Sequence, residues 1–153
     1  MNSLELKVPP PFVALVFAVL MWLLSTLPGA VEVPLPNRRV MIIALVVIGV
    51  LFGFSAMGLF RRAHTTANPM KPETASSLVT NGVFRLSRNP MYVSLVFYLA
   101  AWCVHLSNWV SPLLLPVFVL YIDRFQIKPE ERALTQLYGP DYAAYRARVR
   151  RWL

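Results

Sequence analysis

Long apolar runs separated by short polar segments form the main pattern along the chain. The runs cover residues 12–27, 40–60, 91–106 and 109–122. A helix needs about 20 apolar residues to cross a bilayer, with about 17 as the lower limit. The second run is ample and the first is marginal, whereas the last two are short and separated only by Ser107 and Asn108. The pattern predicts about four transmembrane helices, the last two forming a tight helical hairpin.

Composition supports a membrane protein. Hydrophobic residues make up 57% of the 153 residues and charged residues 14%, which is more apolar than a soluble domain. The net charge of +8 would suit nucleic acid, but lysines and arginines flank the apolar runs and form no stripe with stacking aromatics. His64 and His105 have no partners at metal-ligand spacing. We expect one all-α, polytopic membrane domain over residues 1–153, with neither a nucleic-acid partner nor a metal.

The basic residues also predict an orientation. Most of them lie within residues 61–90 and in the tail from Asp123, and loops rich in Lys and Arg stay on the cytoplasmic side. Both chain ends should then face the cytoplasm, and a bacterial inner membrane is the expected location. Arg38 and Arg39 are the exception, because they fall in a loop expected on the opposite side.

One junction between a loop and an apolar run, NGVFRLSRNPMY (81–92), combines cations with a helix-start signal. Asn89 is a favoured N-cap, and Pro90 is a favoured first helical residue. With Arg88 beside them, the free backbone N–H groups of the new helix would form a corner that attracts anions. A second interpretation is that Arg85 and Arg88 only mark the cytoplasmic side and that the Asn-Pro step only starts the helix.

The tail from Asp123 is a second organised segment. Pro129 should open a helix with Glu130 and Glu131 in its first turn, and the Gly-Pro step that follows should end it. From Asp141, a second short helix should lie in the membrane interface. Its apolar face would comprise Tyr142, Tyr145, Val149 and Trp152. Alternatively, the two acids only begin a helix, and the tail arginines only contact lipid headgroups.

Two segments together carry a family resemblance: LVTNGVFRLSRNPMY (78–92) and PEERALTQLYGPDYAAYRARV (129–149). In their order and spacing they resemble the integral-membrane methyltransferases of the isoprenylcysteine carboxyl methyltransferase and phospholipid methyltransferase superfamily. The resemblance extends from about Asn68 to the last residue. It implies an S-adenosylmethionine site built from the cytoplasmic parts, about 68–92 and 123–153, with a lipid or other hydrophobic acceptor arriving from the bilayer.

The resemblance also implies roles for individual residues. Arg88 would lie near the transferred methyl group and the acceptor. On chemical grounds, Glu131 is a candidate base for an amine acceptor, which must lose a proton before attack; the alternative is that it only caps the helix or pairs with an arginine. Asn89 stands where the carboxyl methyltransferases have a histidine, and Gln126 stands where they carry a second arginine. The first departure removes a contact through an imidazole, and the second weakens the case for a prenylcysteine carboxylate. The cofactor contacts would come from Leu78, Val79, Phe84, Asn89, Pro90, Met91, Tyr92 and Glu130.

The residue types suit methyl transfer on chemical grounds as well. A methyl group on a sulfonium is already activated, so its transfer needs positioning and exclusion of water more than a metal or a nucleophilic side chain. The ammonium group of the cofactor would bind a carboxylate such as Glu130, its carboxylate would bind N–H donors or an arginine, and its adenine would bind apolar or aromatic walls. We expect an S-adenosylmethionine-dependent methyltransferase acting on an apolar or lipid-linked acceptor.

The acceptor and the oligomeric state stay open at this level, since a phospholipid amine, a thiol, a prenylated carboxylate and another hydrophobic acid would all suit an apolar tunnel. The alternative function is a non-enzymatic membrane protein, an assembly factor or carrier, whose basic tail binds anionic lipid. A carrier should place polar or ionisable residues within its spans. These runs offer little beyond Ser55, Ser94 and His105, which favours the enzyme.

Overall fold

A computed structural model describes residues 5–65, 70 and 75–153. These residues are mainly helical, and their only strand-like pairing is an isolated bridge between Glu32 and Asn108. The predicted all-α class is therefore confirmed for the described part of the chain. The α-helices are α1 (Pro10–Ser25), α2 (Arg38–Arg62), α3 (Pro90–Leu106), α4 (Leu114–Ile122) and α5 (Lys128–Arg148). Between them lie the 3-10 turns η2 (Gly82–Arg85) and η3 (Ser111–Leu113) and the π-helical turn η4 (Asp123–Ile127).

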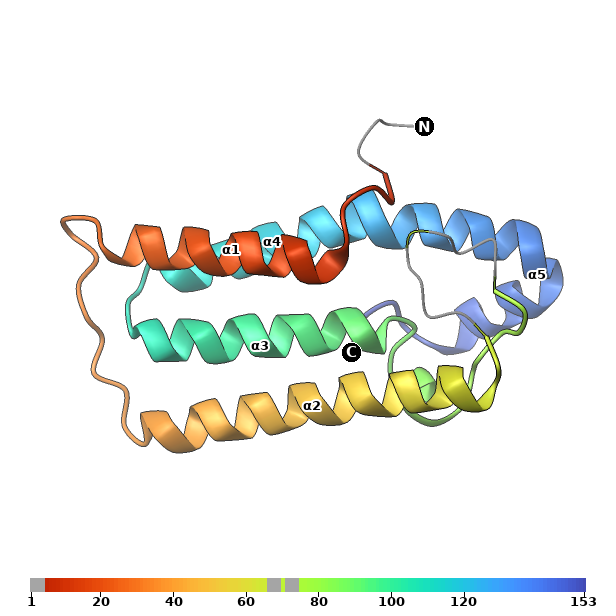
Figure 1. Ribbon diagram of the computed structural model, residues 1–153, viewed down its shortest axis with the longest axis horizontal. Helices are drawn as coiled ribbons and strands as arrows, with labels where there is room; N and C mark the ends of the chain where they lie inside the picture. Colours follow the sequence, from red (N-terminus) through yellow and green to blue (C-terminus); the bar gives the residue numbers. More distant parts are fainter. Residues whose placement is uncertain (1–4, 66–69, 71–74) are drawn as a thin grey trace.

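The first four α-helices alternate in direction along one bundle, with α3 between α1 and α2 (Figure 1). The connections 26–37 and 107–110 close one end of this bundle. The segment 75–89 and α5 lie at the opposite end, together with both ends of the described chain. The two motifs that are far apart in the sequence, around Asn89 and around Glu130, therefore meet at one end of the bundle.

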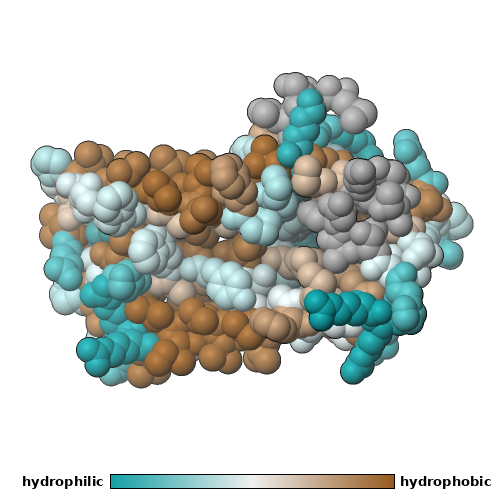
Figure 2. All heavy atoms as spheres, viewed as in Figure 1, coloured by the Kyte–Doolittle hydropathy of each residue, from teal (hydrophilic) through white to brown (hydrophobic). Residues whose placement is uncertain are grey.

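A helix occurs at each predicted span, and the helices differ in how well their lengths suit a bilayer. Of the described helices, α2 is the one that is long and apolar enough to cross a bilayer by length and composition, while α1 and α3 are shorter apolar helices. Figure 2 shows apolar side chains over the bundle and polar side chains gathered toward its ends. Large apolar side chains that face outward include Phe12, Leu15, Ile43, Leu51, Phe54 and Leu120.

Small residues let α2 and α3 approach closely. A Cβ on Gly49 would lie 2.6 Å from the Tyr98 ring, and one on Gly53 would lie 3.3 Å from Ser94 Oγ. Ala56, one turn further along α2, is fully buried. Small residues at this spacing are a common device for packing helices in membranes, because they bring the backbones together. The seam fixes α3, and hence its first residues, against α2.

Arg38, the exception to the charge pattern, has a structural role at the end of the bundle away from the motifs. Its guanidinium donates hydrogen bonds to the carbonyl oxygens of Val104 and His105 in the last turn of α3. Ser107 follows with a left-handed φ of 53°, and its hydroxyl donates to the Val33 carbonyl. Since the last carbonyls of a helix lack partners within it, Arg38 caps α3 and is not a simple orientation marker.

The structure differs from the expected helix over residues 109–122 and shows a helical turn before the tail helix. Residues 109–122 do not form one helix, because Trp109 and Val110 lie in a turn and α4 begins only at Leu114. At its other end, α4 continues through η4 directly into α5, and the Lys128 N–H donates to the Asp123 carbonyl. Glu130 and Glu131 lie in the first turn of α5 as predicted, but η4 precedes that turn, so the two acids do not sit at a free helix N-terminus.

The Gly-Pro step does break the tail helix, as predicted. Gly139 has φ 48° and ψ −118° inside α5, a backbone conformation open to glycine and strained for other residues. The half of α5 after this break does not present its aromatic face to the membrane interface as expected. Tyr142 and Tyr145 are buried and pack with Phe84 and Ala56. The aromatic face is therefore turned inward, where its burial removes apolar surface from water.

Candidate active site

A cavity of about 320 Å³ lies at the end of the bundle where the two motifs meet. It is enclosed by the N-terminal turns of α1 and α3, the second half of α2, the segment 75–84 and both halves of α5. All the residues predicted for the site line this cavity: Leu78, Val79, Phe84, Arg88, Asn89, Pro90, Met91, Tyr92, Glu130 and Glu131. The structure brings these residues together, while their individual roles stay predictions.

The corner around Asn89 is held in a way the sequence did not predict. Pro90 is the first residue of α3, and Asn89 occupies the N-cap position, but its side chain makes no capping hydrogen bond. Instead, Asn89 Nδ2 donates to the Arg151 carbonyl at 2.9 Å. The Ser87 hydroxyl accepts the Asn89 N–H at 3.1 Å and donates to the same Arg151 carbonyl at 3.2 Å. The corner is tied to the end of the described chain.

Arg88 and Glu131 form an ion pair beside the cavity. Arg88 Nη2 donates to Glu131 Oε1 at 2.6 Å, and Arg88 Nη1 donates to the Arg146 carbonyl at 3.1 Å. The side chains of Arg88 and Glu131 are 10% and 9% exposed, so water screens this pair little. Arg88 Nε is buried and has no hydrogen-bond partner in the described protein. A buried unpaired N–H is costly, so this donor is available to a ligand.

Arg151 joins the same carboxylate from the other side. Its Nη2 donates to Glu131 Oε2 at 2.6 Å, its Nε donates to Glu131 Oε1 at 3.1 Å, and its Nη1 donates to Asp123 Oδ1 at 2.9 Å. These bonds raise the pKa of Arg151. Both oxygens of Glu131 are thus occupied by guanidinium N–H groups, which is the strong, bidentate form of this interaction.

Glu130 differs from its neighbour because no arginine or lysine pairs with it in the described structure. Its Oε2 accepts a hydrogen bond from the Tyr92 hydroxyl at 3.0 Å. Burial raises the pKa of the Glu130 carboxyl to about 7, the Tyr92 hydrogen bond opposes this shift, and the charge of Glu131 adds to it. A cationic group of a ligand would stabilise the ionised form of this carboxyl, which lacks a cation from the protein.

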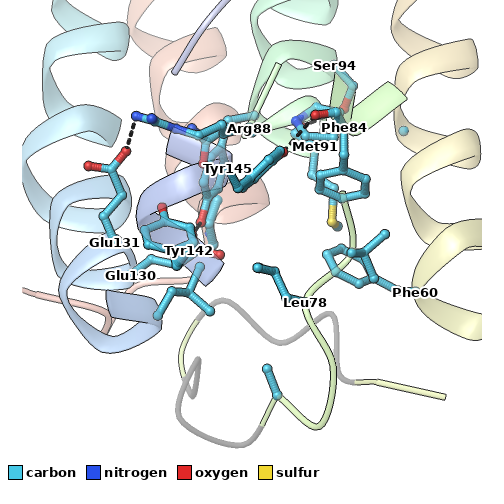
Figure 3. Close-up of a pocket in the computed structure, with 18 of the residues that line it drawn as sticks. Phe60, Leu78, Phe84, Arg88, Met91, Ser94, Glu130, Glu131, Tyr142 and Tyr145 are labelled. Atoms are coloured by element: carbon cyan, nitrogen blue, oxygen red, sulfur yellow. Dashed lines mark hydrogen bonds and ion pairs between the residues drawn. The ribbon is translucent and has the colours of Figure 1, made fainter. Parts of the chain in front are cut away.

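The remaining walls are apolar and aromatic. Arg88, Glu131, Tyr142 and Tyr145 gather on one side of the cavity in Figure 3, with Phe60 and Leu78 across from them. The Tyr145 hydroxyl donates to the Phe84 carbonyl at 2.7 Å, which fixes the two motifs against each other. Burial raises the pKa of Tyr142 to about 12, so this phenol stays neutral. Such walls suit an aromatic heterocycle or an alkyl chain.

Sequence reasoning missed several residues of the site. Tyr142 and Tyr145 were placed in a membrane interface, although their spacing on one helix face was a usable signal for a buried wall. Pro10 and Pro11 at the start of α1 also line the cavity, and nothing in the sequence links them to it. Arg151 had no signal beyond its charge. Gln126 lies outside the cavity lining: it is fully buried, and its Nε2 donates to the Val8 carbonyl.

The cavity fits the charges of an aminoacyl group with a positive and a negative end. Glu130 lacks a protein cation, Arg88 Nε lacks an acceptor, and both residues line the same space. Apolar and aromatic residues surround them, and the volume of about 320 Å³ falls in the range of small-molecule pockets. The residues present therefore fit S-adenosylmethionine. Among the described residues there is no group of three metal-ligating side chains.

Comparison with known proteins places these observations in a family. The model of the phospholipid methyltransferase family matches residues 37–141. The chain is 43% identical over 63 residues to an uncharacterized protein of Haemophilus influenzae, which covers 41% of this chain and all of that protein. It is 27% identical over 107 residues to protein-S-isoprenylcysteine O-methyltransferase B of Arabidopsis thaliana, covering 70% of this chain and 54% of the plant protein.

A probable protein-S-isoprenylcysteine O-methyltransferase of Oryza sativa subsp. indica is 31% identical over 110 residues, covering 70% of this chain and 56% of the rice protein. The chain thus spans about half the length of these plant relatives. No solved structure matches the chain with significance. The matched region contains the first motif and the start of the second, including the acidic pair, and it ends before Tyr142 and Tyr145.

Proposed function

Because the chain belongs to the phospholipid methyltransferase family, we propose that it is an S-adenosylmethionine-dependent methyltransferase of the membrane that acts on an apolar or lipid-linked acceptor. The observation that carries the proposal is a largely apolar cavity lined by Glu130, whose carboxyl has no protein cation, and by Arg88, whose Nε has no acceptor in the described protein. The plant relatives are named as methyltransferases of protein-S-isoprenylcysteine, which supports a hydrophobic acceptor.

In this proposal, residues of each motif bind different groups of the cofactor. Glu130 binds the ammonium group, since a charge-assisted hydrogen bond favours the ionised carboxylate. The Met91 N–H at the start of α3 and Arg88 Nε receive the carboxylate, which a helix N-terminus attracts, because Pro90 has no N–H and the Tyr92 N–H donates to the Asn89 carbonyl. Phe84, Leu78 and Val79 contact the adenine. When bound, the cofactor supplies an activated methyl group, and the protein contributes orientation and a site shielded from water.

Arg88 and Glu131 then act as one unit beside the reacting atoms. Arg88 orients the acceptor and stabilises negative charge on it, because its guanidinium is planar and held at two nitrogens by the protein. The earlier suggestion that Glu131 is a base remains a prediction. Since both of its oxygens accept hydrogen bonds from arginines, we assign it the role of holding Arg88.

The membrane placement follows the same proposal. We propose that α1, α2, α3 and the η3–α4 segment cross a bacterial inner membrane, with the cavity and both chain ends on the cytoplasmic side. The supporting facts are the outward apolar side chains over the bundle and the collection of both ends of the described chain near the cavity (Figures 1 and 2). The acceptor enters from the bilayer, while the water-soluble cofactor enters from the cytoplasm.

Cofactor binding and product identification test the proposal directly. Protein purified in detergent is incubated with radiolabelled S-adenosylmethionine, with and without S-adenosylhomocysteine as competitor. Saturable, competable binding is the expected result, and its absence in a folded sample favours a non-enzymatic protein. Adding lipid extracts as acceptors, followed by chromatography of the labelled material, identifies the methylated product and separates an amine from a thiol or a carboxylate.

A further inference from the structure

The segment after α5 turns back and contacts the Asn89 corner at several points. The Arg88 N–H donates to the Arg150 carbonyl at 3.0 Å, and Asn89 Nδ2 donates to the Arg151 carbonyl at 2.9 Å. Trp152 packs against the apolar core of the bundle. The backbone of this segment therefore holds the residues that come just before α3.

The Arg151 side chain binds the same carboxylate as Arg88, that of Glu131. Glu131 receives Arg88 Nη2 on Oε1 and Arg151 on both oxygens. The third nitrogen of Arg151, Nη1, is anchored on Asp123 in η4. A planar guanidinium with donors in a fixed fork can meet two carboxylates in this way, and a lysine ammonium cannot.

We propose that Arg151 is a positioning residue of the active site, which fixes Glu131 and through it the guanidinium of Arg88. The inference rests on the proposed function and names a residue outside the two motifs that carry the family resemblance. Without Arg151, Glu131 keeps one arginine for two oxygens, so the carboxylate and Arg88 can both rotate.

Through the charge of Glu131, Arg151 should also affect the pKa of Glu130. The groups that face Glu130 are Tyr92 from α3 and Glu131 from α5, and the charge of Glu131 raises the pKa of the Glu130 carboxyl. Arg151 neutralises part of that charge at a distance of 2.6 Å. Removing the guanidinium should shift the Glu130 pKa further upward, so that a ligand ammonium binds an ionised carboxylate only at higher pH.

The test uses S-adenosylhomocysteine as the probe and measures its affinity by calorimetry from pH 5.5 to 8.5 in detergent. We compare wild type with Arg151→Gln, Arg151→Lys, Glu131→Gln and the double variant Arg151→Gln/Glu131→Gln. Arg148→Gln is the matched control, because it removes the same charge from an exposed side chain whose Nε bonds only within α5. Thermal unfolding of each variant is followed in parallel.

For Arg151→Gln we expect about tenfold weaker binding near neutral pH and a midpoint of the pH profile displaced upward, in line with losing a charged hydrogen-bond partner. Arg151→Lys should recover part of the affinity and of the midpoint. The double variant should bind as Glu131→Gln does, because both changes act through one carboxylate.

The positioning role is overturned if wild type binds the probe while Arg151→Gln and Arg151→Lys keep the wild-type affinity and midpoint, even when their unfolding temperatures fall. That outcome would make Arg151 purely structural. If wild type itself shows no saturable binding, the proposed function fails and this inference fails with it. The two failures are therefore distinguishable by the wild-type titration alone.

Discussion

The Tyr92 hydroxyl donates a 3.0 Å hydrogen bond to Glu130 Oε2, which joins the first turn of α3 to the first turn of α5 across 38 positions in the sequence. This bond stabilises the ionised carboxylate, whereas burial and the nearby Glu131 disfavour it. The effect of burial exceeds that of the hydrogen bond, so the pKa of Glu130 rises to about 7. The protonation of Glu130 therefore changes within the physiological pH range.

Cofactor binding should depend on pH through this carboxyl. A ligand ammonium needs the ionised form, so affinity for S-adenosylhomocysteine should rise as pH increases through about 7 and fall below it, following the raised pKa of Glu130. Glu130→Gln should bind about tenfold or more weakly at pH 8, since hydrogen bonds to charged groups contribute about 1.5 to 3 kcal/mol. It should also flatten the pH profile. Wild-type affinity for Glu130→Gln would remove the carboxyl from the cofactor site.

Removing the hydroxyl of Tyr92 should move the same profile upward. Tyr92→Phe deletes the hydrogen bond that opposes the raised pKa of Glu130, so the midpoint of cofactor binding should shift to higher pH while the cavity keeps its shape. The control is Tyr138→Phe, whose hydroxyl donates to the Ala75 carbonyl and makes no contact with Glu130. Calorimetry over the same pH series measures both. Equal midpoints in the two variants would contradict the coupling.

The seam between α2 and α3 should be sensitive at one glycine and tolerant at another. Gly49→Ala would place a Cβ 2.6 Å from the Tyr98 ring, whereas a Cβ on Gly58 meets nothing within 4 Å. Overpacking costs about 1 to 3 kcal/mol, while alanine in an open helical position stabilises by roughly 0.5 to 1 kcal/mol relative to glycine. Thermal unfolding in detergent should therefore fall for Gly49→Ala and stay equal or rise for Gly58→Ala. Equal losses would show that the Gly49 contact is not the cause.

Much of this arrangement was readable from the sequence. The apolar runs predicted where the helices lie, because a bundle with an outward apolar surface needs long apolar segments whatever its tertiary contacts. Pro90 predicted the start of α3, because proline has no N–H to lose there. The two motifs predicted which residues share the cavity, since chain reversal at the far end of the bundle returns α5 to the level of Asn89.

Other features depend on contacts that local patterns do not encode. Pro129 predicts a helix start, but the chain is already helical through η4 before it. Glu131 is held by Arg88 and Arg151, and Glu130 is held by the Tyr92 hydroxyl, so neither acid depends on a free helix end. Arg38 reads as an orientation signal, but it caps α3 through carbonyl oxygens 66 and 67 positions away. In the sequence, Arg151 is indistinguishable from the other basic residues of the tail, but in the structure it binds Glu131 and Asp123. Each of these roles arises from a partner distant in the sequence.

Topology offers a test that needs no ligand. Reporter fusions before Pro10 and after Leu153 should both report the cytoplasmic side, and a reporter inserted in the connection 26–37 should report the opposite side, because the described chain ends lie at the cavity end of the bundle. Alkaline phosphatase and green fluorescent protein fusions distinguish the two sides. A cytoplasmic signal from the 26–37 insertion, in a protein that still binds cofactor, would require a different number of crossings.

Arg88 should be essential for turnover in a way that its charge alone does not explain. Its Nη2 bonds Glu131, its Nη1 bonds the Arg146 carbonyl, and its Nε is unpartnered. Arg88→Lys keeps a positive charge for Glu131 but loses the planar fork, so folding and much of the cofactor affinity should remain. Methyl transfer should fall by on the order of a hundredfold, the cost of a displacement of about 1 Å at a reacting centre.

The matched control is Arg85→Lys, in η2, whose side chain is exposed and lies outside the cavity lining. Initial rates with labelled S-adenosylmethionine and the lipid extract that supports wild-type methylation compare the two variants. We expect Arg85→Lys to retain wild-type rates. A fast Arg88→Lys with a slow Arg85→Lys would mean that the site arginine is assigned wrongly. Full activity of both would mean that a charge at the cytoplasmic side is sufficient, because neither guanidinium would then be needed to orient the acceptor.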